Sequence, residues 1–597
     1  MSEQGIQVER APANGVNGHH NGLSNGLSNG LSNGHANGVQ NGVQNGNQNG
    51  QDVSFEAIII GAGFAGLREL YELRKRGVSA RVFDAASGVG GTWYWNRYPG
   101  ARTDSESWVF IFTFLEELGM EWSWKERFPQ QPEVEEYLNK MTDYLDLRKD
   151  ITLSTRIVSA YRDEEKNIWK VTTDKGETFT SKFLITAAGV LATPLKPPFP
   201  GVDSFQGEWY QTGLWPNKKI DFTGKRVGLI GAGATAVQVA PIVAHNAKSL
   251  TVFQRTPNYV VPARNYPIGK EQMDEINRSY AEITQRARNH SMGFDIVDSK
   301  LKYDDVEDEK AIQRVLDSGW EKGGFHYFFE TFGDTLTNPK TNEVASEFVR
   351  NKIRAIVNDK EKAELLCPKY PIFSKRPPAG HNYYQIYNRS NVELVDIRND
   401  PIQEITPKGV KLGNSSKEWE FDIIIFALGF DAVTGTLGNI GIHGSEGQSL
   451  ADVFHKELTT SYGITLPGFP NLFMIFGPQV PFANGPVVID IIADWIGKTI
   501  SHLKSHNIAR IEPKKEAAED WSLQVNQLFE QTVVAQSAMD VKSWYVGANI
   551  KSKLHKTLLY FGGIPLYISK LSQEIEDGYP SYILSPASAS ASNKAAA

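Results

Sequence analysis

Two glycine-rich stretches, GAGFAG at Gly61–Gly66 and GAGATA at Gly231–Ala236, carry the residue types and spacing that most clearly suggest chemistry. Each follows an apolar run typical of a buried strand and precedes the spacing of an amphipathic helix. Glycines at such a turn let a pyrophosphate approach the backbone, and the start of the helix supplies amide donors. This context predicts a dinucleotide site at each stretch. We expect contacts from Gly61, Gly63, Gly66, Gly231, Ala232, Gly233, Ala234, Thr235, Ala236 and Val237.

The residue that ends the next strand differs between the two sites. After the first helix, SARVFDA ends near Asp84, and an acid there binds an unphosphorylated ribose, which favours FAD or NAD. After the second, SLTVFQRTPN carries Gln254 and Arg255 instead. A guanidinium binds a 2′-phosphate that a carboxylate would repel, so the second site is predicted to take NADPH. The alternative for Arg255 is an exposed arginine without a ligand.

A third segment, GGTWYWNRYPGARTDSES at Gly90–Ser107, combines a glycine pair with clustered aromatic residues. The glycines let backbone approach a planar ligand, and the tryptophans and tyrosine of TWYW offer stacking surface. The turn that follows ends at Asp104. The alternative is a core loop held by aromatic packing. Far along the chain, Lys375 and Arg376 form a cationic pair in a proline-flanked loop.

The segment FQGEWYQTGLWP, Phe205–Pro216, connects the two glycine stretches. A chain with two dinucleotide sites needs a connection that sets how they face each other, and we interpret this segment as that connection.

Composition excludes several classes of protein. The chain has 597 residues, a net charge of −7 and a pI near 6.0, which argues against a nucleic-acid binder. Its single cysteine, Cys367, excludes a disulfide framework, a CxxC redox pair and a cysteine-rich zinc site. No apolar run approaches the ~20 residues of a membrane span, and the N-terminus lacks a secretory signal. We therefore expect an intracellular, cytoplasmic protein without a membrane span.

The elements that position these residues predict an α/β fold with two Rossmann-like dinucleotide-binding domains and a helical insertion. The Asn/Gly-rich N-terminus is expected to be disordered, with a docking peptide as the alternative. The expected divisions are a tail at 1–52, a first FAD-binding part at 53–193, a linker at 194–220, an NADP-binding domain at 221–390 with a helical insertion at 265–365, a largely FAD-domain remainder at 391–584, and a tail at 585–597.

Together these segments resemble the type I Baeyer–Villiger monooxygenases, FAD- and NADPH-dependent oxygenases of flavoprotein class B. The resemblance spans about Phe55 to Leu584, and GGTWYWNRYPGARTD fits the family's second signature at every fixed position. The connection fits FxGxxxHxxxWP except at Gln211, which replaces the histidine, and its Trp-Pro ending favours this family over the flavin monooxygenases of amines and sulfides. The run SKR at Ser374–Arg376 and the loop SWYVGANI at Ser543–Ile550 also match the family. Long chains with low-complexity N-termini resemble fungal enzymes acting on cyclic, terpenoid or polyketide-derived ketones.

The resemblance implies roles for matching positions. Arg376 corresponds to the arginine that stabilises the negatively charged flavin peroxide, and Asp104 to the carboxylate that orients it. Lys375 and Arg255 correspond to the clamp on the 2′-phosphate, and Trp544 to a tryptophan that closes over the nicotinamide. The FAD-lining positions are Gly91, Thr92, Trp93, Tyr94, Trp95, Asp104, Ser105 and Phe110, the last replacing an aromatic hydroxyl of most relatives. Further NADP positions are Arg102, Thr103 and Gln254.

The chemistry of the residues agrees with these roles. Attack on a ketone requires an anion held in a dry site, and arginine stays charged there and offers several donors. The alternative for Arg376 is a second phosphate ligand beside Lys375.

Glutamine at position 211 cannot titrate near neutrality as histidine does, but it donates and accepts hydrogen bonds. If the family residue is a hinge pin, Gln211 can replace it; if it must carry a proton, activity is altered. We favour the hinge pin because Asp104, Lys375 and Arg376 are all present.

Three functions remain in competition. The first is a Baeyer–Villiger enzyme that uses NADPH and O₂ to convert a ketone to an ester or lactone. The second is a related oxygenase of sulfur or nitrogen, and the third is a catalytically decayed nucleotide-binding protein. A disulfide reductase of the same architecture is excluded by the single cysteine.

Overall fold

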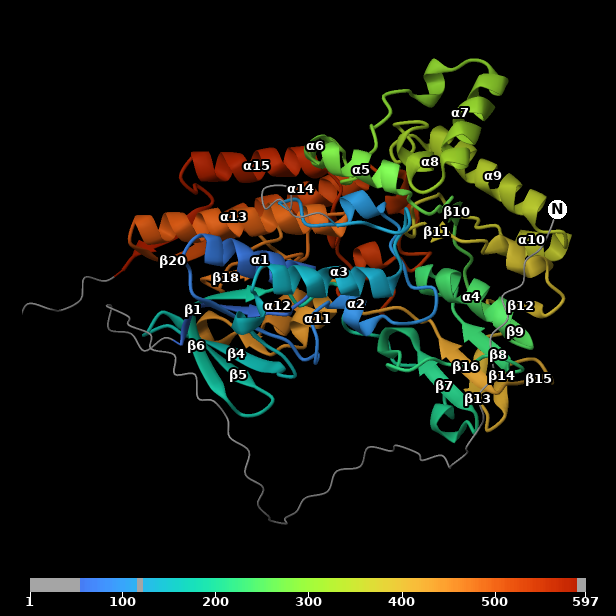
Figure 1. Cartoon of the computed structure of the whole chain (residues 1–597), viewed down its shortest axis with the longest axis horizontal. Helices are drawn as coiled ribbons and strands as arrows, with labels where there is room; N and C mark the ends of the chain where they lie inside the picture. The colour runs from blue at the N-terminus through green and yellow to red at the C-terminus, as the bar shows by residue number, and fades with distance from the viewer. Residues whose placement is uncertain (1–53, 115–121, 588–597) are drawn as a thin grey trace, which may run out of the picture. The chain divides into compact units, whose positions relative to one another are not determined.

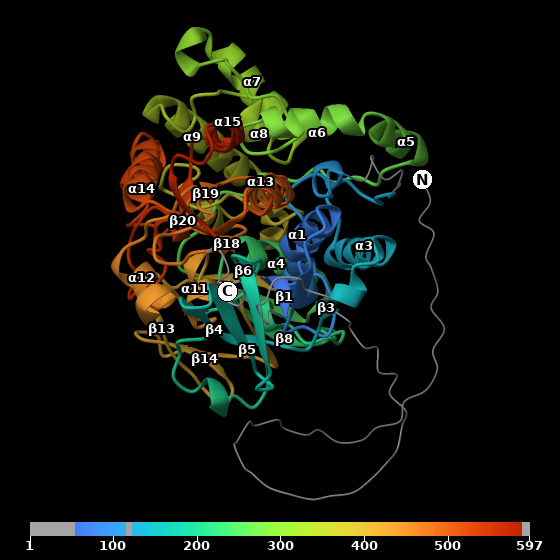
Figure 2. The ribbon, with the colours of Figure 1, turned by 90° about the vertical axis from the view of Figure 1, so that its left-hand side faces the viewer.

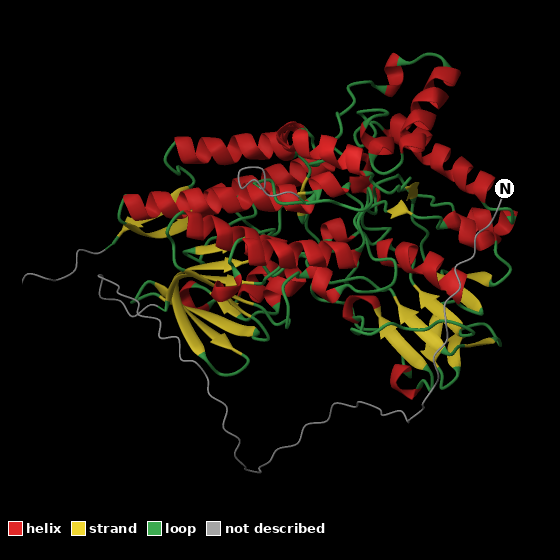
Figure 3. Cartoon of the chain, in the orientation of Figure 1, coloured by secondary structure: helices red, strands yellow, loops and turns green. Residues whose placement is uncertain are grey.

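A computed structural model describes residues 54–114 and 122–587 of the protein. Its strands form two main sheets, and helices pack around both (Figure 1, Figure 3). The predicted α/β fold with two Rossmann-like domains is confirmed. The predicted tail at 1–52 lies outside the described residues.

The first sheet is parallel at its centre and carries an antiparallel extension. Parallel pairs join β3 to β2, β2 to β1, β1 to β6 and β6 to β18. Strands β4, β5 and β6 form an antiparallel meander, and β17 pairs with β4 in parallel at the edge of the sheet. The bounds are β1 (Phe55–Ile60), β2 (Ala80–Phe83), β3 (Ile151–Thr152), β4 (Ile157–Asp163), β5 (Ile168–Thr173), β6 (Thr178–Thr186), β17 (Ile442–His443) and β18 (Leu472–Met474).

Helices α1 (Phe64–Lys75) and α13 (Gly485–Ser505) pack together over this sheet (Figure 2). The middle of β1 is wholly buried, because a central parallel strand is covered on both faces. The apolar run before the first glycine turn is therefore an innermost strand, and the turn is held at the edge of a rigid core.

The second sheet is parallel in the order β12-β9-β8-β16-β7. Helix α4 (Ala234–Asn246) follows β8 directly, which makes the second glycine turn the link between them. The bounds of the strands are β7 (Glu208–Gln211), β8 (Arg226–Ile230), β9 (Ser249–Gln254), β12 (Val392–Asp396) and β16 (Ile423–Phe426).

The second sheet takes strands from three of the predicted divisions of the chain. β7 lies within the predicted linker at 194–220, and β12 and β16 lie within 391–584, which was assigned largely to the first domain. The chain rejoins the first sheet only at β17. The sheet that a strand joins is hard to predict because fully buried parallel strands have similar apolar sequences. The sequence pattern therefore predicts a strand but not its sheet.

The region between 265 and 365 is largely helical, as predicted. It does more than cover the second domain, because α6 packs against α15 and against the short helix η1 (Ser107–Val109) of the first domain. The helices are α5 (Lys270–Arg278), α6 (Tyr280–Asn289), α7 (Glu309–Lys322), α8 (His326–Phe329), α9 (Pro339–Ile356) and α10 (Lys360–Leu366).

The remaining elements are short or peripheral. The helices are α2 (Thr92–Trp95), α3 (Gln131–Tyr144), α11 (Thr434–Gly438), α12 (Leu450–Lys456), α14 (Lys515–Glu530) and α15 (Ile564–Glu576). The strands are β10 (Val261–Pro262), β11 (Ala379–Gly380), β13 (Ile402–Ile405), β14 (Gly409–Leu412), β15 (Glu418–Glu420), β19 (Val480–Pro481), β20 (Ile508–Pro513), β21 (Leu559–Tyr560) and β22 (Tyr582–Pro586).

Strand β22 pairs with β20 and reaches Pro586, and residues 588–597 of the predicted tail lie outside the described residues. Among residues 54–114 and 122–587, no helix combines the length and apolarity that a membrane crossing requires.

Candidate active site

The first glycine turn packs so closely against backbone carbonyl groups that Gly61 and Gly66 leave no room for a side chain. Gly61 has φ +112°, and a Cβ there would lie 2.4 Å from the carbonyl oxygen of Ala187. A Cβ on Gly66 would lie 1.7 Å from the carbonyl oxygen of Gly61, which fixes the first turn of α1 against the end of β1. A Cβ on Gly63 would lie 3.2 Å from the Cα of Gly91, and Gly63 caps α1 without a side-chain bond. The helix start is thus left open for an anion.

Asp84 directly follows β2 and holds this turn in place. Its two carboxylate oxygens accept the N–H groups of Ala62, at 2.6 Å, and of Ala86, at 2.7 Å. Burial raises the pKa of Asp84, and the two amide donors act in the opposite direction. The side chain stays partly exposed, so lone pairs remain for a ribose hydroxyl.

The aromatic segment divides between packing and exposure. Gly91 has φ +56° and begins α2 (Thr92–Trp95). Trp93 meets Phe110 edge-to-face at 5.4 Å between ring centroids, and Phe110 meets Phe64 of α1 at 5.3 Å. Trp95, by contrast, is exposed. Trp93 and Phe110 therefore pack as the core-loop alternative predicts. Both side chains are only partly buried, so they can also contact a flat ligand.

The second glycine turn has the same build with one difference. Gly231 has φ +135°, and a Cβ there would lie 2.3 Å from the carbonyl oxygen of Ala427. At Gly233, however, a Cβ would meet no described atom within 4 Å. Ala236, which replaces the third glycine, is buried in α4. The space in front of Gly233 suits a pyrophosphate.

A loop of the first domain binds α4. The hydroxyl of Tyr98 donates to Oε1 of Gln238 at 2.8 Å, and Nε2 of Gln238 donates to the carbonyl oxygen of Arg102 at 3.1 Å. The guanidinium of Arg102 lies 3.4 Å from Glu126 and 3.4 Å from Nδ1 of His381. Burial and the charge of Arg102 lower the pKa of His381 to about 3, so His381 is neutral. The structure thus pairs Arg102 with protein groups.

Thr103 and Ser105 are buried in the same loop. Oγ1 of Thr103 donates to the carbonyl oxygen of Ser105 at 2.8 Å, and Oγ of Ser105 donates to Oδ1 of Asn484 at 3.0 Å. These bonds fix the backbone on either side of Asp104.

Arg376 and Asp104, 272 residues apart in the chain, form an ion pair. Nη1 of Arg376 lies 2.5 Å from Oδ2 of Asp104, whose side chain is 4% exposed, against 34% for the arginine. Oδ1 of Asp104 has no hydrogen-bond partner among the described residues. The guanidinium also lies over the ring of Phe325, at 5.6 Å from its centroid. A buried carboxylate therefore orients a half-exposed cation.

Lys375, beside it in the chain, belongs to a cluster of cations. Burial, then the charges of Arg255 and Lys542, lower the pKa of Lys375 to about 8. Arg255 is exposed at the end of β9, whereas Gln254 is buried and donates to the carbonyl oxygen of Leu365 at 2.8 Å. The structure brings together the predicted Arg255 and Lys375, and adds Lys542, which sequence reasoning missed.

Trp544 belongs to a C-terminal segment that contacts both domains. Its 3₁₀ turn η10 (Trp544–Val546) follows a second such turn, η9 (Val533–Ser537). Oγ of Ser537 lies 2.7 Å from Oγ of Ser374, next to Lys375. The Trp544 ring lies 6.2 Å from that of Phe482, in the first domain.

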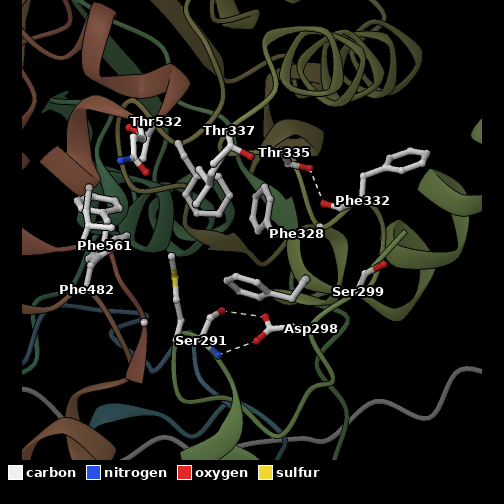
Figure 4. A pocket seen from close by; sticks show the side chains of 18 of the residues that line it. Ser291, Asp298, Ser299, Phe328, Phe332, Thr335, Thr337, Phe482, Thr532 and Phe561 are labelled. Carbon is white, nitrogen blue, oxygen red and sulfur yellow. Dashed lines mark hydrogen bonds between the residues drawn. The ribbon is translucent and has the colours of Figure 1, made fainter. Parts of the chain in front are cut away.

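A cavity of about 330 Å³ has aromatic walls (Figure 4), and one of its lining residues, Phe328, packs at 6.1 Å from Phe325, the ring under Arg376. Phe373, three residues before Arg376, and Phe482, which packs on Tyr545, both line it. Figure 4 shows Ser291 bonded to Asp298 at one side, through its amide and hydroxyl groups. The main aromatic lining is Phe328, Phe329, Phe332, Phe373, Phe482, Tyr560 and Phe561. Sequence reasoning missed this cavity because its walls come from distant segments, including the helical insertion.

Gln211 is buried at the end of β7. Its Nε2 donates to the carbonyl oxygen of Leu195 at 2.8 Å. Leu195 in turn donates its N–H to the carbonyl oxygen of Gly429, just beyond β16. The side-chain amide of Gln211 thus joins β7 to the segment around Leu195, which precedes it in the chain.

Comparison with known proteins agrees with this geometry. Residues 58–314 match the family described as pyridine nucleotide-disulphide oxidoreductase. The chain is 40% identical to a Baeyer–Villiger monooxygenase of Pseudooceanicola batsensis, over 89% of this chain and 96% of the relative. It is also 40% identical to the phenazine N-monooxygenase PhzNO1 of Lysobacter antibioticus, over 89% and 97%. The solved structure of OTEMO in complex with FAD and NADP superposes with a TM-score of 0.86 at 37% identity, covering 90% of this chain and all of that one.

Family membership follows from extent as well as identity, since the matches cover 89% of this chain and nearly all of each relative. The lone Cys367 is buried, which separates this chain from disulfide-reducing proteins of the same architecture. The chain belongs to the Baeyer–Villiger monooxygenase family.

Proposed function

We propose that the protein binds FAD and NADPH and uses O₂ to convert a ketone to an ester or lactone, releasing NADP⁺ and water. The observation that carries this proposal is the Arg376–Asp104 pair, in which a buried carboxylate holds a partly exposed cation.

The residues present fit both cofactors. At the first turn, the open start of α1, the close approach of Gly63 and Gly91, and the half-free Asp84 suit FAD. At the second, the space before Gly233, which no described atom fills, and the cations Arg255 and Lys375 suit a 2′-phosphorylated dinucleotide. FAD, once reduced by NADPH, supplies the chemistry that activates O₂.

Arg376 has the position and charge to stabilise negative charge that develops during oxygen transfer. A preorganised cation in a site that excludes water accelerates such a step because it needs no reorganisation. Asp104 holds the guanidinium in place, and its Oδ1, which has no partner among the described residues, keeps a second acceptor free. The alternative role of Arg376, a ligand of the cofactor phosphate, fits less well because its partner in the structure is an anion.

We assign the ketone to the aromatic cavity. At about 330 Å³ it lies within the range of small-molecule sites, and its walls are mainly aromatic and aliphatic with a few polar groups. A cyclic ketone with a bulky apolar skeleton would replace water there, which supports the prediction of terpenoid- or polyketide-derived substrates. Small linear ketones would leave most of the walls uncovered.

The second candidate function is oxygenation of nitrogen or sulfur. It is favoured by the 40% identity to a phenazine N-monooxygenase, since aromatic walls also suit a flat heterocycle. Assays of a cyclic ketone, an aromatic amine and a sulfide separate the two functions.

The proposed function is tested by purifying the protein and following NADPH oxidation over a set of bulky cyclic ketones. We expect flavin absorbance, ketone-dependent NADPH consumption and a product heavier by one oxygen, with little free peroxide. A colourless protein would contradict the proposal and support a decayed enzyme. An unchanged ketone beside oxygenated amine or sulfide would favour the second candidate.

The lone cysteine, buried and unpaired with any other, supports an intracellular location, which we propose as part of the same account.

A further inference from the structure

We propose that Lys542 is a third ligand of the cofactor's 2′-phosphate, and that this contact makes the Trp544 segment a determinant of selectivity for NADPH over NADH. The inference rests on the proposed function, in which the second glycine turn binds a phosphorylated dinucleotide.

The first observation is a fixed contact between two distant segments. Oγ of Ser537 lies 2.7 Å from Oγ of Ser374, and Ser374 is fully buried. Lys375 follows Ser374 directly, so the C-terminal segment is anchored next to one of the two predicted phosphate ligands.

The second observation is the compact turn that follows this anchor. Val541 donates its N–H to the carbonyl oxygen of Ser537 at 3.0 Å, and Ser543 donates its N–H to that of Ala538 at 2.8 Å. Between them Lys542 has φ +55°, a left-handed conformation that non-glycine residues rarely adopt. Val541 and Ser543 are buried, whereas Lys542 is exposed. The turn thus presents the lysine outward at a defined place.

The third observation is uncompensated charge. Burial and then the charges of Arg255 and Lys542 lower the pKa of Lys375, yet none of these three cations forms an ion pair with a carboxylate among the residues that the structure describes. Like charges placed together without a partner destabilise a protein. A dianionic phosphate relieves that repulsion and accepts several charged hydrogen bonds at once.

The consequence concerns the segment as well as the ligand. Trp544 lies two residues after Lys542, so a phosphate bound by Lys542 holds the tryptophan segment next to the nucleotide. NADH lacks the 2′-phosphate and offers Lys542 no partner, so it would hold the segment less firmly.

The experiment measures equilibrium binding of NADP⁺ and of NAD⁺ to the FAD-loaded protein by calorimetry, without ketone. We expect Lys542→Gln to weaken NADP⁺ binding about tenfold, the effect of one lost charge-assisted contact, and NAD⁺ binding less than about twofold. Lys542→Arg should stay close to wild type. Lys551→Gln, which removes an exposed lysine from the same segment, should change neither affinity.

A second readout is hydrogen exchange of residues 537–550. We expect NADP⁺, but not NAD⁺, to protect these amides in the wild type, and the difference to disappear in Lys542→Gln. Equal weakening of both nucleotides in Lys542→Gln, or unchanged NADP⁺ binding, would overturn the inference. Wild-type protein that binds NADP⁺ selectively but converts no ketone would contradict the proposed oxygenation and leave the role of Lys542 intact.

Discussion

Arg376 and Asp104 should act as one unit, because the carboxylate matters only through the guanidinium that it orients. We expect Arg376→Ala to reduce ester formation roughly 100- to 1,000-fold, the usual effect of removing one preorganised donor. Asp104→Ala should give a smaller loss, and the double variant should be no worse than Arg376→Ala.

The measurement is ester formed per NADPH consumed, with flavin content determined for each variant. Arg398→Ala, which breaks a surface pair with Asp396, is the matched control and should retain wild-type yield. Additive losses in the double variant would show that Asp104 acts independently of Arg376.

Lys375 predicts a pH dependence of cofactor binding. Burial and two neighbouring cations lower its pKa to about 8, so its ammonium form declines as the pH rises from 7 to 9. A 2′-phosphate binds the ammonium form, and NADP⁺ affinity should therefore fall over this window while NAD⁺ affinity stays nearly constant. In Lys375→Met the difference in pH dependence should vanish. Binding titrations at several pH values check this, and a parallel decline for NAD⁺ would contradict it.

Gln211 tests whether the connection needs a titratable group. Its hydrogen bond to Leu195 is one that a neutral side chain can make, which supports the hinge-pin interpretation. We expect Gln211→His to change cofactor affinity or coupling only modestly. A hundredfold rise in ester formation by that variant would show instead that the position must carry a proton.

Among the elements, we expect a glycine-to-alanine substitution to affect folding at the first glycine turn and cofactor binding at the second. In Gly66→Ala the new Cβ would overlap the carbonyl oxygen of Gly61, so we expect loss of FAD and lower stability. In Gly233→Ala the Cβ enters space that no described protein atom fills. That variant should fold and retain FAD but lose at least roughly tenfold in NADP⁺ affinity, since the pyrophosphate needs the same space.

Flavin absorbance, thermal unfolding and NADP⁺ titration distinguish these outcomes. Undiminished NADP⁺ binding by Gly233→Ala would place the pyrophosphate elsewhere.

The elements also show what sequence can predict. The strand, glycine turn and helix around Gly61 and Gly231 follow from local chemistry, and so does the acid at Asp84. The sheet that β12 and β16 join does not, because buried parallel strands look alike whichever sheet they enter. Local sequence therefore does not show that β12 and β16 still belong to the second sheet.

Within the site, local sequence identified Arg376, Asp104, Lys375 and Arg255 only as separate residues, with the family resemblance implying their roles. Their proximity depends on long-range folding. Lys542 has no motif of its own, and its place beside Lys375 comes from the contact between Ser374 and Ser537. The cavity is likewise beyond local patterns, because the insertion and the C-terminal segments supply opposite parts of its lining.

In the whole molecule, we propose that the two nucleotide turns, the Arg376–Asp104 pair and the aromatic cavity form one oxygen-transferring centre. Each part alone fits other functions. The nucleotide turns also suit reductases, and the cavity also suits a heterocycle that is oxygenated on nitrogen.

The central claim is that one atom of O₂ is inserted beside the carbonyl of a ketone. Turnover of a bulky cyclic ketone with NADPH under ¹⁸O₂ tests this most directly, with the product analysed by mass spectrometry and NMR. We predict a lactone that carries one ¹⁸O in its ring, formed in near-equal amount to the NADPH consumed. NADPH consumption that yields only peroxide and intact ketone, across a broad set of cyclic ketones, would contradict the account.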